Sequence, residues 1–167
     1  DAERGILKKK GLYMKKTILT IIAAMAVCSC KDNLHLVFSD YFVCIKDEYG
    51  MSSSDVNTEI EGVYTYYVNL VSPTRTEKLS VDYEIISGAG LENGVDYIIV
   101  SGSRQVVFAP GITSMPIRID FRQKRVDENK DNTITIRLKS TSDSSVRIGY
   151  PGPEAKFSEY KIKKVNL

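Results

Sequence analysis

Residues 79–87 have the sequence Leu-Ser-Val-Asp-Tyr-Glu-Ile-Ile-Ser, in which apolar and polar side chains alternate. Leu79, Val81, Tyr83 and Ile85 share one parity, and the residues between them are Ser, Asp and Glu. Successive side chains of a strand point to opposite faces. The stretch therefore predicts a strand with one buried and one solvated face, which is typical of antiparallel sheets.

The same alternation recurs along most of the chain, in short segments rich in β-branched and aromatic residues and separated by Gly, Pro, Asn, Asp or Ser. We expect strands at 36–45, 62–71, 79–87, 97–101, 104–109, 116–122, 133–140, 146–149 and 157–165. Residues 49–55 are interpreted as a loop or an interrupted edge strand. About eight short strands predict an all-β fold, an antiparallel immunoglobulin-like β-sandwich, with a barrel as the alternative.

The N-terminal part has the pattern of an export signal. The segment Met14-Lys15-Lys16, with two basic residues, precedes an apolar run at 17–27, and this run is shorter than the ~20 residues that a membrane-spanning helix needs. We expect 14–29 to be a lipoprotein signal peptide that forms a helix. Residues 1–13 precede the start at Met14 and are interpreted as an over-extended translation start.

Two cysteines lie at the end of this run, and their spacing separates them. Val27-Cys28-Ser29-Cys30 resembles the lipobox of bacterial lipoproteins, in which a small residue precedes the acylated cysteine. If Cys28 were the acylated residue, Val27 would occupy the preceding position, which requires a small side chain. We therefore predict that Cys30 is the lipid anchor and that Cys28 is removed. The alternatives are a plain secretory protein and an uncleaved segment at the membrane edge.

The predicted anchor sets the domain organisation and the location. Residues 30–35 are a short tether, and 36–167 form the sandwich domain. Several acyl chains on one cysteine anchor a protein stably, whereas a single chain does not. Lys31 after the anchor favours the outer membrane, on its periplasmic or cell-surface side. Cys44 is then the one cysteine left in the domain, and we expect a buried, inert thiol.

The charge distribution argues against a nucleic-acid partner. The formal net charge is +2, from 23 basic and 21 acidic residues. Six of the basic and two of the acidic residues precede Cys30, so the remainder is mildly acidic. Nucleic-acid binding needs a concentrated basic surface.

Four segments together resemble the Calx-beta domain. The order is a Gly-x-Asp-Tyr motif, a Phe-x-Pro-Gly turn, an alternating strand, and an acidic hairpin followed by a strand that ends in Leu. These segments are Glu92–Tyr97, Val106–Gly111, Ile117–Ile119 and Thr133–Leu138. The resemblance spans Val63 to Lys164 and implies a β-sandwich with a calcium-dependent structural or adhesion role. The chain is also similar to small uncharacterised surface lipoproteins of Bacteroidota, which implies a glycan or an outer-membrane protein as partner.

The acidic hairpin is the candidate metal site. Asp127, Asn129 and Asp131 offer side-chain oxygens at alternate positions, and calcium prefers six to eight oxygen ligands. Asn129 and Asn132 stand where Calx-beta domains usually carry Glu. The alternative is a solvated hairpin tip, because Asn and Asp tolerate turn dihedral angles. Calcium is the one cofactor that the sequence suggests.

Tyrosines clustered between 62 and 71 provide the candidate ligand site. By parity Tyr64 and Tyr66 point inward with Val68, whereas Tyr67 points outward. An exposed aromatic side chain can stack on a sugar ring or anchor a protein partner. The alternative is a Tyr that fills a cross-strand pair.

These features favour a non-catalytic outer-membrane lipoprotein whose sandwich binds a glycan or a partner protein. A calcium-dependent module of Calx-beta type is the alternative. An enzyme is the third hypothesis, and it would need an all-carboxylate mechanism because the single histidine, His35, lies in the tether, outside the core. The paired carboxylates Asp82 and Glu84 are interpreted as part of a solvated sheet face.

Overall fold

This computed structural model describes residues 40–166. The predicted signal peptide, the tether and Cys30 lie outside the described residues. Between 40 and 166, the chain contains no helix that is long and apolar enough to cross a membrane.

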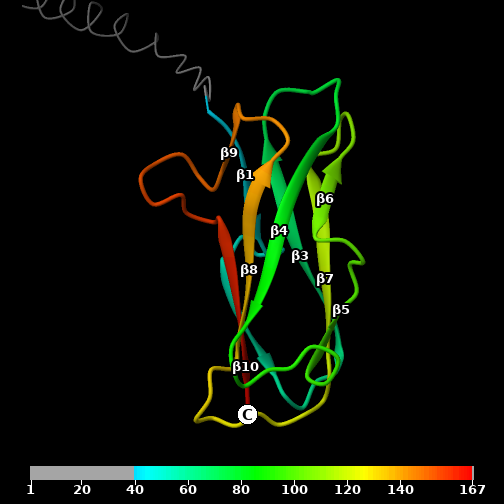
Figure 1. The fold of residues 1–167 in the computed structure, drawn as a ribbon, viewed down its shortest axis with the longest axis vertical. Helices are drawn as coiled ribbons and strands as arrows, with labels where there is room; N and C mark the ends of the chain where they lie inside the picture. Colours follow the sequence, from blue (N-terminus) through cyan, green and yellow to red (C-terminus); the bar gives the residue numbers. More distant parts are fainter. Residues whose placement is uncertain (1–39, 167) are drawn as a thin grey trace, which may run out of the picture. The chain divides into compact units, whose positions relative to one another are not determined.

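Two five-stranded sheets face each other (Figure 1). Sheet A contains, in spatial order, β5 (Tyr97–Ile99), β7 (Ser114–Phe121), β3 (Gly62–Val71), β1 (Tyr41–Lys46) and β9 (Val146–Ile148). Sheet B contains β2 (Ser53–Asn57), β10 (Glu159–Val165), β8 (Thr133–Thr141), β4 (Leu79–Ser87) and β6 (Gln105–Phe108). The predicted all-β sandwich is confirmed.

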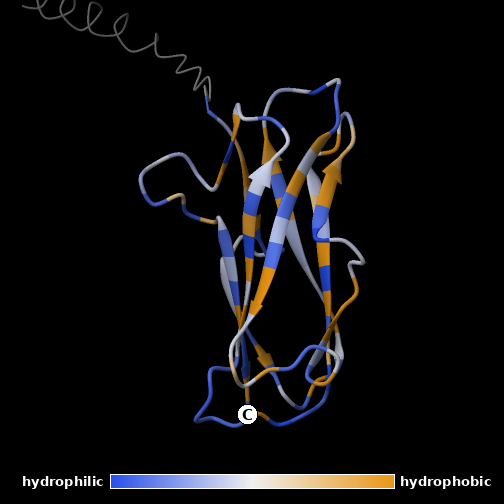
Figure 2. Ribbon diagram, viewed as in Figure 1, coloured by the Kyte–Doolittle hydropathy of each residue, from blue (hydrophilic) through white to orange (hydrophobic). Residues whose placement is uncertain are grey.

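Alternate residues of the strands form the core between the sheets, as the sequence predicts. Ile117, Ile119 and Phe121 of β7 are fully buried, and so are Ile134 and Ile136 of β8. Figure 2 shows hydrophobic and hydrophilic residues following one another along the strands. Each fully buried side chain of this size stabilises the fold by about 1.5–3 kcal/mol relative to an exposed one.

Two edge pairings are parallel, which the prediction of an antiparallel sandwich did not include. β9 runs parallel to β1, and β2 runs parallel to β10. Parallel neighbours cannot be joined by a tight hairpin. Here the chain changes sheets between β1 and β2 and again between β9 and β10, so each short edge strand lies beside a strand to which no hairpin connects it.

The Pro-Gly turn after β6 has a clear physical cause. The Ile112 nitrogen donates to the Ala109 oxygen at 3.0 Å, and Gly111 has a φ of 81°. Pro110 supplies the fixed φ of the first central position, and the second central position of a type II turn requires a positive φ. The turn therefore returns the chain from sheet B to β7 of sheet A.

The connection from β9 to β10 carries aromatic side chains onto the outer side of β1. The Tyr150 ring lies 4.8 Å from Phe42 and 5.2 Å from Phe157, centroid to centroid. Phe42 and Cys44 have the outward parity in β1, yet both are 1% exposed. Cys44 is a free, buried thiol, as predicted, and desolvation raises its pKa.

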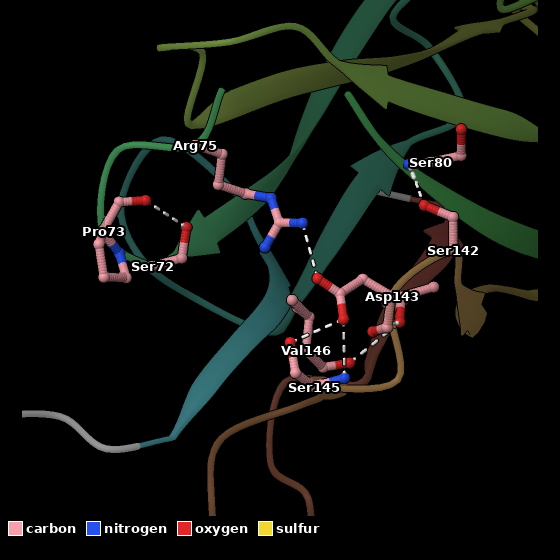
Figure 3. A network of polar contacts seen from close by, with 9 residues as sticks. Ser72, Pro73, Arg75, Ser80, Ser142, Asp143, Ser145 and Val146 are labelled. Atoms are coloured by element: carbon pink, nitrogen blue, oxygen red, sulfur yellow. Dashed lines mark hydrogen bonds and ion pairs between the residues drawn. The ribbon is translucent and has the colours of Figure 1, made fainter. Parts of the chain in front are cut away.

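Polar contacts join the β3–β4 loop to the β8–β9 turn (Figure 3). The Arg75 Nη2 atom lies 2.6 Å from Asp143 Oδ2, and the hydroxyl and backbone N–H of Ser145 both donate to Asp143 Oδ1. The Ser145 hydroxyl is the largest cause that lowers the pKa of Asp143 to about 2, with the Ser145 backbone and Arg75 next.

The first prediction concerns acid stability. Because its folded pKa is depressed from 3.8 to about 2, Asp143 contributes stability that is fully present above about pH 4 and is lost as the pH falls towards 2. Asp143→Asn should therefore be less stable than the wild type at pH 6, and the difference should shrink between pH 4 and pH 2. Urea unfolding at a series of pH values measures this, and a difference that stays constant over that interval would contradict it.

Candidate functional site

A groove lined by tyrosines lies beside β3, and we call it the tyrosine groove. It has a volume of about 510 Å³. Its five tyrosines are Tyr49, Tyr64, Tyr66, Tyr67 and Tyr160. They come from the β1–β2 loop, from β3 of sheet A and from β10 of sheet B, so residues of both sheets line the groove.

One of the two buried tyrosines of the groove, Tyr66, has a hydroxyl without a well-formed hydrogen bond. Tyr66 is 2% exposed, its ring lies 4.8 Å from that of Tyr160, and its hydroxyl makes no hydrogen bond of acceptable geometry with any described group. Burial raises its pKa, and the neighbouring Ser54 side chain lowers it in part. The hydroxyl therefore remains protonated, and the Ser54 side chain is the polar group beside it.

The neighbouring tyrosine is satisfied, which provides a direct comparison. The Tyr160 hydroxyl donates to Asp47 Oδ2 at 2.9 Å. Burial is the main cause that raises the pKa of Tyr160 to about 12, and the Asp47 carboxylate adds to it. Asp47 is itself held in place, because its other oxygen accepts from the backbone N–H groups of Tyr49 and Met51.

The second prediction follows from this contrast. Tyr66→Phe should raise the free energy of unfolding by about 1 kcal/mol, because it removes a buried hydroxyl that has no partner. Tyr160→Phe is the matched control and should lower it by about 1.5 kcal/mol, because it leaves a charge-assisted hydrogen bond unmade. Urea denaturation of both variants measures the effects. Equal losses would show that the Tyr66 hydroxyl has a partner in the folded protein.

Tyr67, the predicted ligand-binding residue, lies half-buried on the outer side of sheet A, between Lys46 of β1 and Pro116 of β7 in the strand register. It also lines the tyrosine groove. Sequence parity gave its direction, but the groove itself depends on where β1 stops pairing with β3.

The predicted calcium ligands lie in the β7–β8 loop, and only two of them contact each other. Asp127 Oδ1 accepts from the backbone and side-chain nitrogens of Asn129 at 3.0 and 3.1 Å. Both bonds lower the pKa of Asp127. Asp131 accepts from the Thr133 nitrogen and packs against Gly88 of the β4–β5 loop. Within residues 40–166 no group of three or more His, Cys, Asp and Glu residues is placed to hold a metal ion.

A hollow of about 600 Å³ lies beside this loop. The side-chain oxygen of Asn132 is buried there without a partner, while its nitrogen donates to the Asp127 carbonyl at 2.8 Å. Three ammonium-bearing residues line the same hollow, namely Lys130, Lys163 and Lys164. Calcium prefers several anionic oxygens, and Glu128 and Asp131 supply carboxylates to this hollow beside the three ammonium groups.

The Gly-x-Asp-Tyr motif has a structural role that the sequence did not reveal. Asp96 is 3% exposed, accepts from the Glu92 nitrogen at 2.9 Å and lies 3.1 Å from Lys124. Lys164 of β10 points into the same end of the sandwich, fully buried, and donates to the Arg122 carbonyl at 2.8 Å. The parity that Lys164 shares with buried Ile162 was the signal that could have predicted its burial.

The carboxylates on the outer face of sheet B do not face a cleft. Asp82 accepts hydrogen bonds from Ser140 and Gln105, and the Ser140 hydroxyl is the larger cause that lowers its pKa. Glu84 pairs with Arg137 at 3.2 Å. Acid–base catalysis needs carboxyls that face a shared cleft in different environments, and this exposed face provides neither.

The two packed sheets form an all-β sandwich module. Its features are the buried Asp96 of the Gly-x-Asp-Tyr motif and the tyrosine groove. The Calx-beta domain matches residues 48–158, and the chain therefore belongs to the Calx-beta family. A solved structure of unknown function from Bacteroides ovatus has a TM-score of 0.52 and 10% identity, over 75% of this chain and 47% of that one. The chain thus spans about half of that structure, and the likeness shows the fold alone. No curated protein matches.

Proposed function

We propose that this Calx-beta protein is a non-catalytic binding module, held at the outer membrane by a lipid on Cys30, and that the tyrosine groove is its ligand site. The observation that supports the site most directly is the gathering of five tyrosines around one groove. One of them, Tyr66, has a buried hydroxyl that makes no hydrogen bond of acceptable geometry in the described part of the chain. Unpaired buried donors are rare because each costs about 1–3 kcal/mol, and a ligand acceptor would remove that cost.

The aromatic surface supports the same role. Tyr49 is 82% exposed and Tyr67 is half-buried, so both present ring surface to a ligand. Tyrosine side chains combine a large apolar face with a polar end and are enriched at binding sites for this reason. A glycan or a protein segment would use both properties.

Binding is tested with the whole chain in detergent micelles. A glycan array and a pull-down from outer-membrane extract should yield a ligand that is lost in a Tyr49→Ala/Tyr67→Ala variant. Ile86→Ala, on the opposite sheet and 40% exposed, is the control and should bind normally. Binding that the double variant retains, or two blank screens, would refute the groove as the ligand site.

Anchoring is tested separately. Cys30→Ser should abolish incorporation of a palmitate analogue and release the protein from the membrane fraction, whereas Cys28→Ser should change neither. Label that persists in the Cys30→Ser variant would overturn the proposed anchor.

A calcium-dependent structural module is the second candidate, favoured by the unpartnered Asn132 oxygen. Calorimetric titration with calcium should then give heat that Asp127→Ala and Asp131→Ala abolish. No heat at millimolar calcium would eliminate this candidate.

A further inference from the structure

Half of β3 has an open edge. β3 pairs with β7 from Gly62 to Asn69, but with β1 only from Tyr67 to Val71. In the described part of the chain, no strand pairs with 62–66 on the side opposite β7. An unpaired edge of this kind is a template for another strand.

The edge is open because β1 turns away from β3. The Gly50 nitrogen donates to the Asp47 oxygen at 3.1 Å, and the Asp47 nitrogen donates to the Met51 oxygen at 3.1 Å. This turn directs the chain from sheet A into β2 of sheet B. Continued pairing would have placed Glu48 opposite Thr65, since Lys46 lies opposite Tyr67.

Hydrogen bonds elsewhere in β3 show which backbone groups are free. The Leu70 nitrogen donates to the Thr113 oxygen, on the β7 side. Successive residues of a strand direct their N–H and C=O groups to opposite sides. Val63 and Thr65 therefore direct theirs to the open side, and both residues line the tyrosine groove.

Three carboxylate side chains line the groove beside this edge. Asp47, Glu48 and Asp55 line it, and none of its described lining residues is Lys, Arg or His. None of the three carboxylates forms an ion pair with a described residue. A cationic side chain would find carboxylates and tyrosine faces together, and both attract it.

We propose that an extended protein segment carrying a Lys or Arg side chain adds as a strand to the open edge of β3 at Val63 and Thr65 and lies along the tyrosine groove. The inference rests on the proposed ligand role of the groove and names the partner. Backbone pairing supplies affinity in strand addition, and side-chain pockets supply specificity. The carboxylates would select the basic side chain.

The probe is a blocked heptapeptide of alternating Thr and Val with a central Lys, compared with the same peptide carrying a central Glu. Amide chemical shifts of the whole chain in micelles report the binding. The Lys peptide should shift residues of β3 and of the β1–β2 loop, and the Glu peptide should bind about tenfold or more weakly. Equal binding of the two peptides would refute the selection by charge.

Two variants of one residue separate backbone pairing from side-chain contact. Thr65→Pro removes an N–H that faces the open edge but breaks no hydrogen bond to β7. It should weaken binding of the Lys peptide by about tenfold or more. Thr65→Val keeps the N–H and should bind within about twofold of the wild type. Melting curves confirm that both variants fold, and Val63→Pro replaces Thr65→Pro if that variant does not. Full binding by the folded proline variant would refute strand addition.

The outcomes also separate this inference from the proposed function. Oligosaccharide binding that depends on Tyr49 and Tyr67, with no effect of either peptide, would keep the groove as a ligand site and overturn strand addition. No binding of peptide, oligosaccharide or extract protein at the groove would overturn both.

Discussion

Asp96→Asn should lower the free energy of unfolding by about 3 kcal/mol. Asn preserves the shape of the side chain and an oxygen for the Glu92 nitrogen, but it removes the carboxylate that lies 3.9 Å from the Lys164 ammonium. The Lys164 side chain is fully buried and would then share its charge only with two backbone carbonyls. Removing one partner of a buried ion pair typically costs about 3–5 kcal/mol, because the charge that remains is uncompensated.

A charge effect at this site has a pH signature. Burial lowers the pKa of Lys164 from 10.5, and the Asp96 carboxylate raises it in opposition. Without that carboxylate the folded pKa falls further, while the unfolded pKa stays near 10.5. Between the folded pKa of Lys164 and 10.5 the unfolded state then binds more protons than the folded state. The stability of the variant should therefore rise with pH, and its deficit relative to the wild type should diminish towards pH 10.

Urea unfolding of three variants tests this explanation. Asp82→Asn is the matched control on an exposed strand and should cost less than about 1 kcal/mol. Asp96→Asn combined with Lys164→Met removes both charges and should recover most of the loss. A loss that is unchanged by the second substitution would assign the effect of Asp96 to the loop geometry rather than to the buried charge.

The strands could be predicted because their energetics are local in the sequence. Every second residue is buried from Leu79 to Tyr83 in β4 and from Ile134 to Leu138 in β8, and the alternation that produces this burial is visible without any partner strand. β2 lacks this signal, since only Val56 of its five residues is buried. Its pairing with β10 depends on backbone bonds to a strand about a hundred residues away, which no local pattern encodes.

The candidate site was predictable only in part for a related reason. Parity placed Tyr66 inside and Tyr67 outside, and both directions agree with the structure. The groove that joins them arises from the length over which β1 pairs with β3, which is a property of the assembled sheets. The loop at 127–132 was approached through its oxygen spacing alone, and the sequence did not indicate that Asp127 Oδ1 accepts hydrogen bonds from the backbone and side chain of Asn129.

Gly149→Ala should lower the free energy of unfolding by about 3–4 kcal/mol, because two separate costs coincide there. Gly149 has a φ of 77°, a conformation that costs an L-residue about 1–2 kcal/mol. An added Cβ would also lie 2.3 Å from the carbonyl oxygen of Ala155, and displacing packed backbone typically costs 1–3 kcal/mol. Gly149 donates to the Val43 oxygen at 2.8 Å, so the displacement would also strain the attachment of the loop to β1.

Two other glycines of this chain separate those costs. Gly50→Ala has the same backbone problem, with a φ of 80° and nothing within 4 Å of the added Cβ, and it should cost about 1–2 kcal/mol. Gly62→Ala has neither problem and should be neutral or stabilise the protein by about 0.5 kcal/mol. Thermal and urea unfolding of the three variants should therefore rank their losses as Gly149, then Gly50, then Gly62. Equal losses at Gly149 and Gly50 would mean that the loop yields to the added methyl group, and that the contacts of Tyr150 with Phe42 and Phe157 do not hold it rigidly against β1.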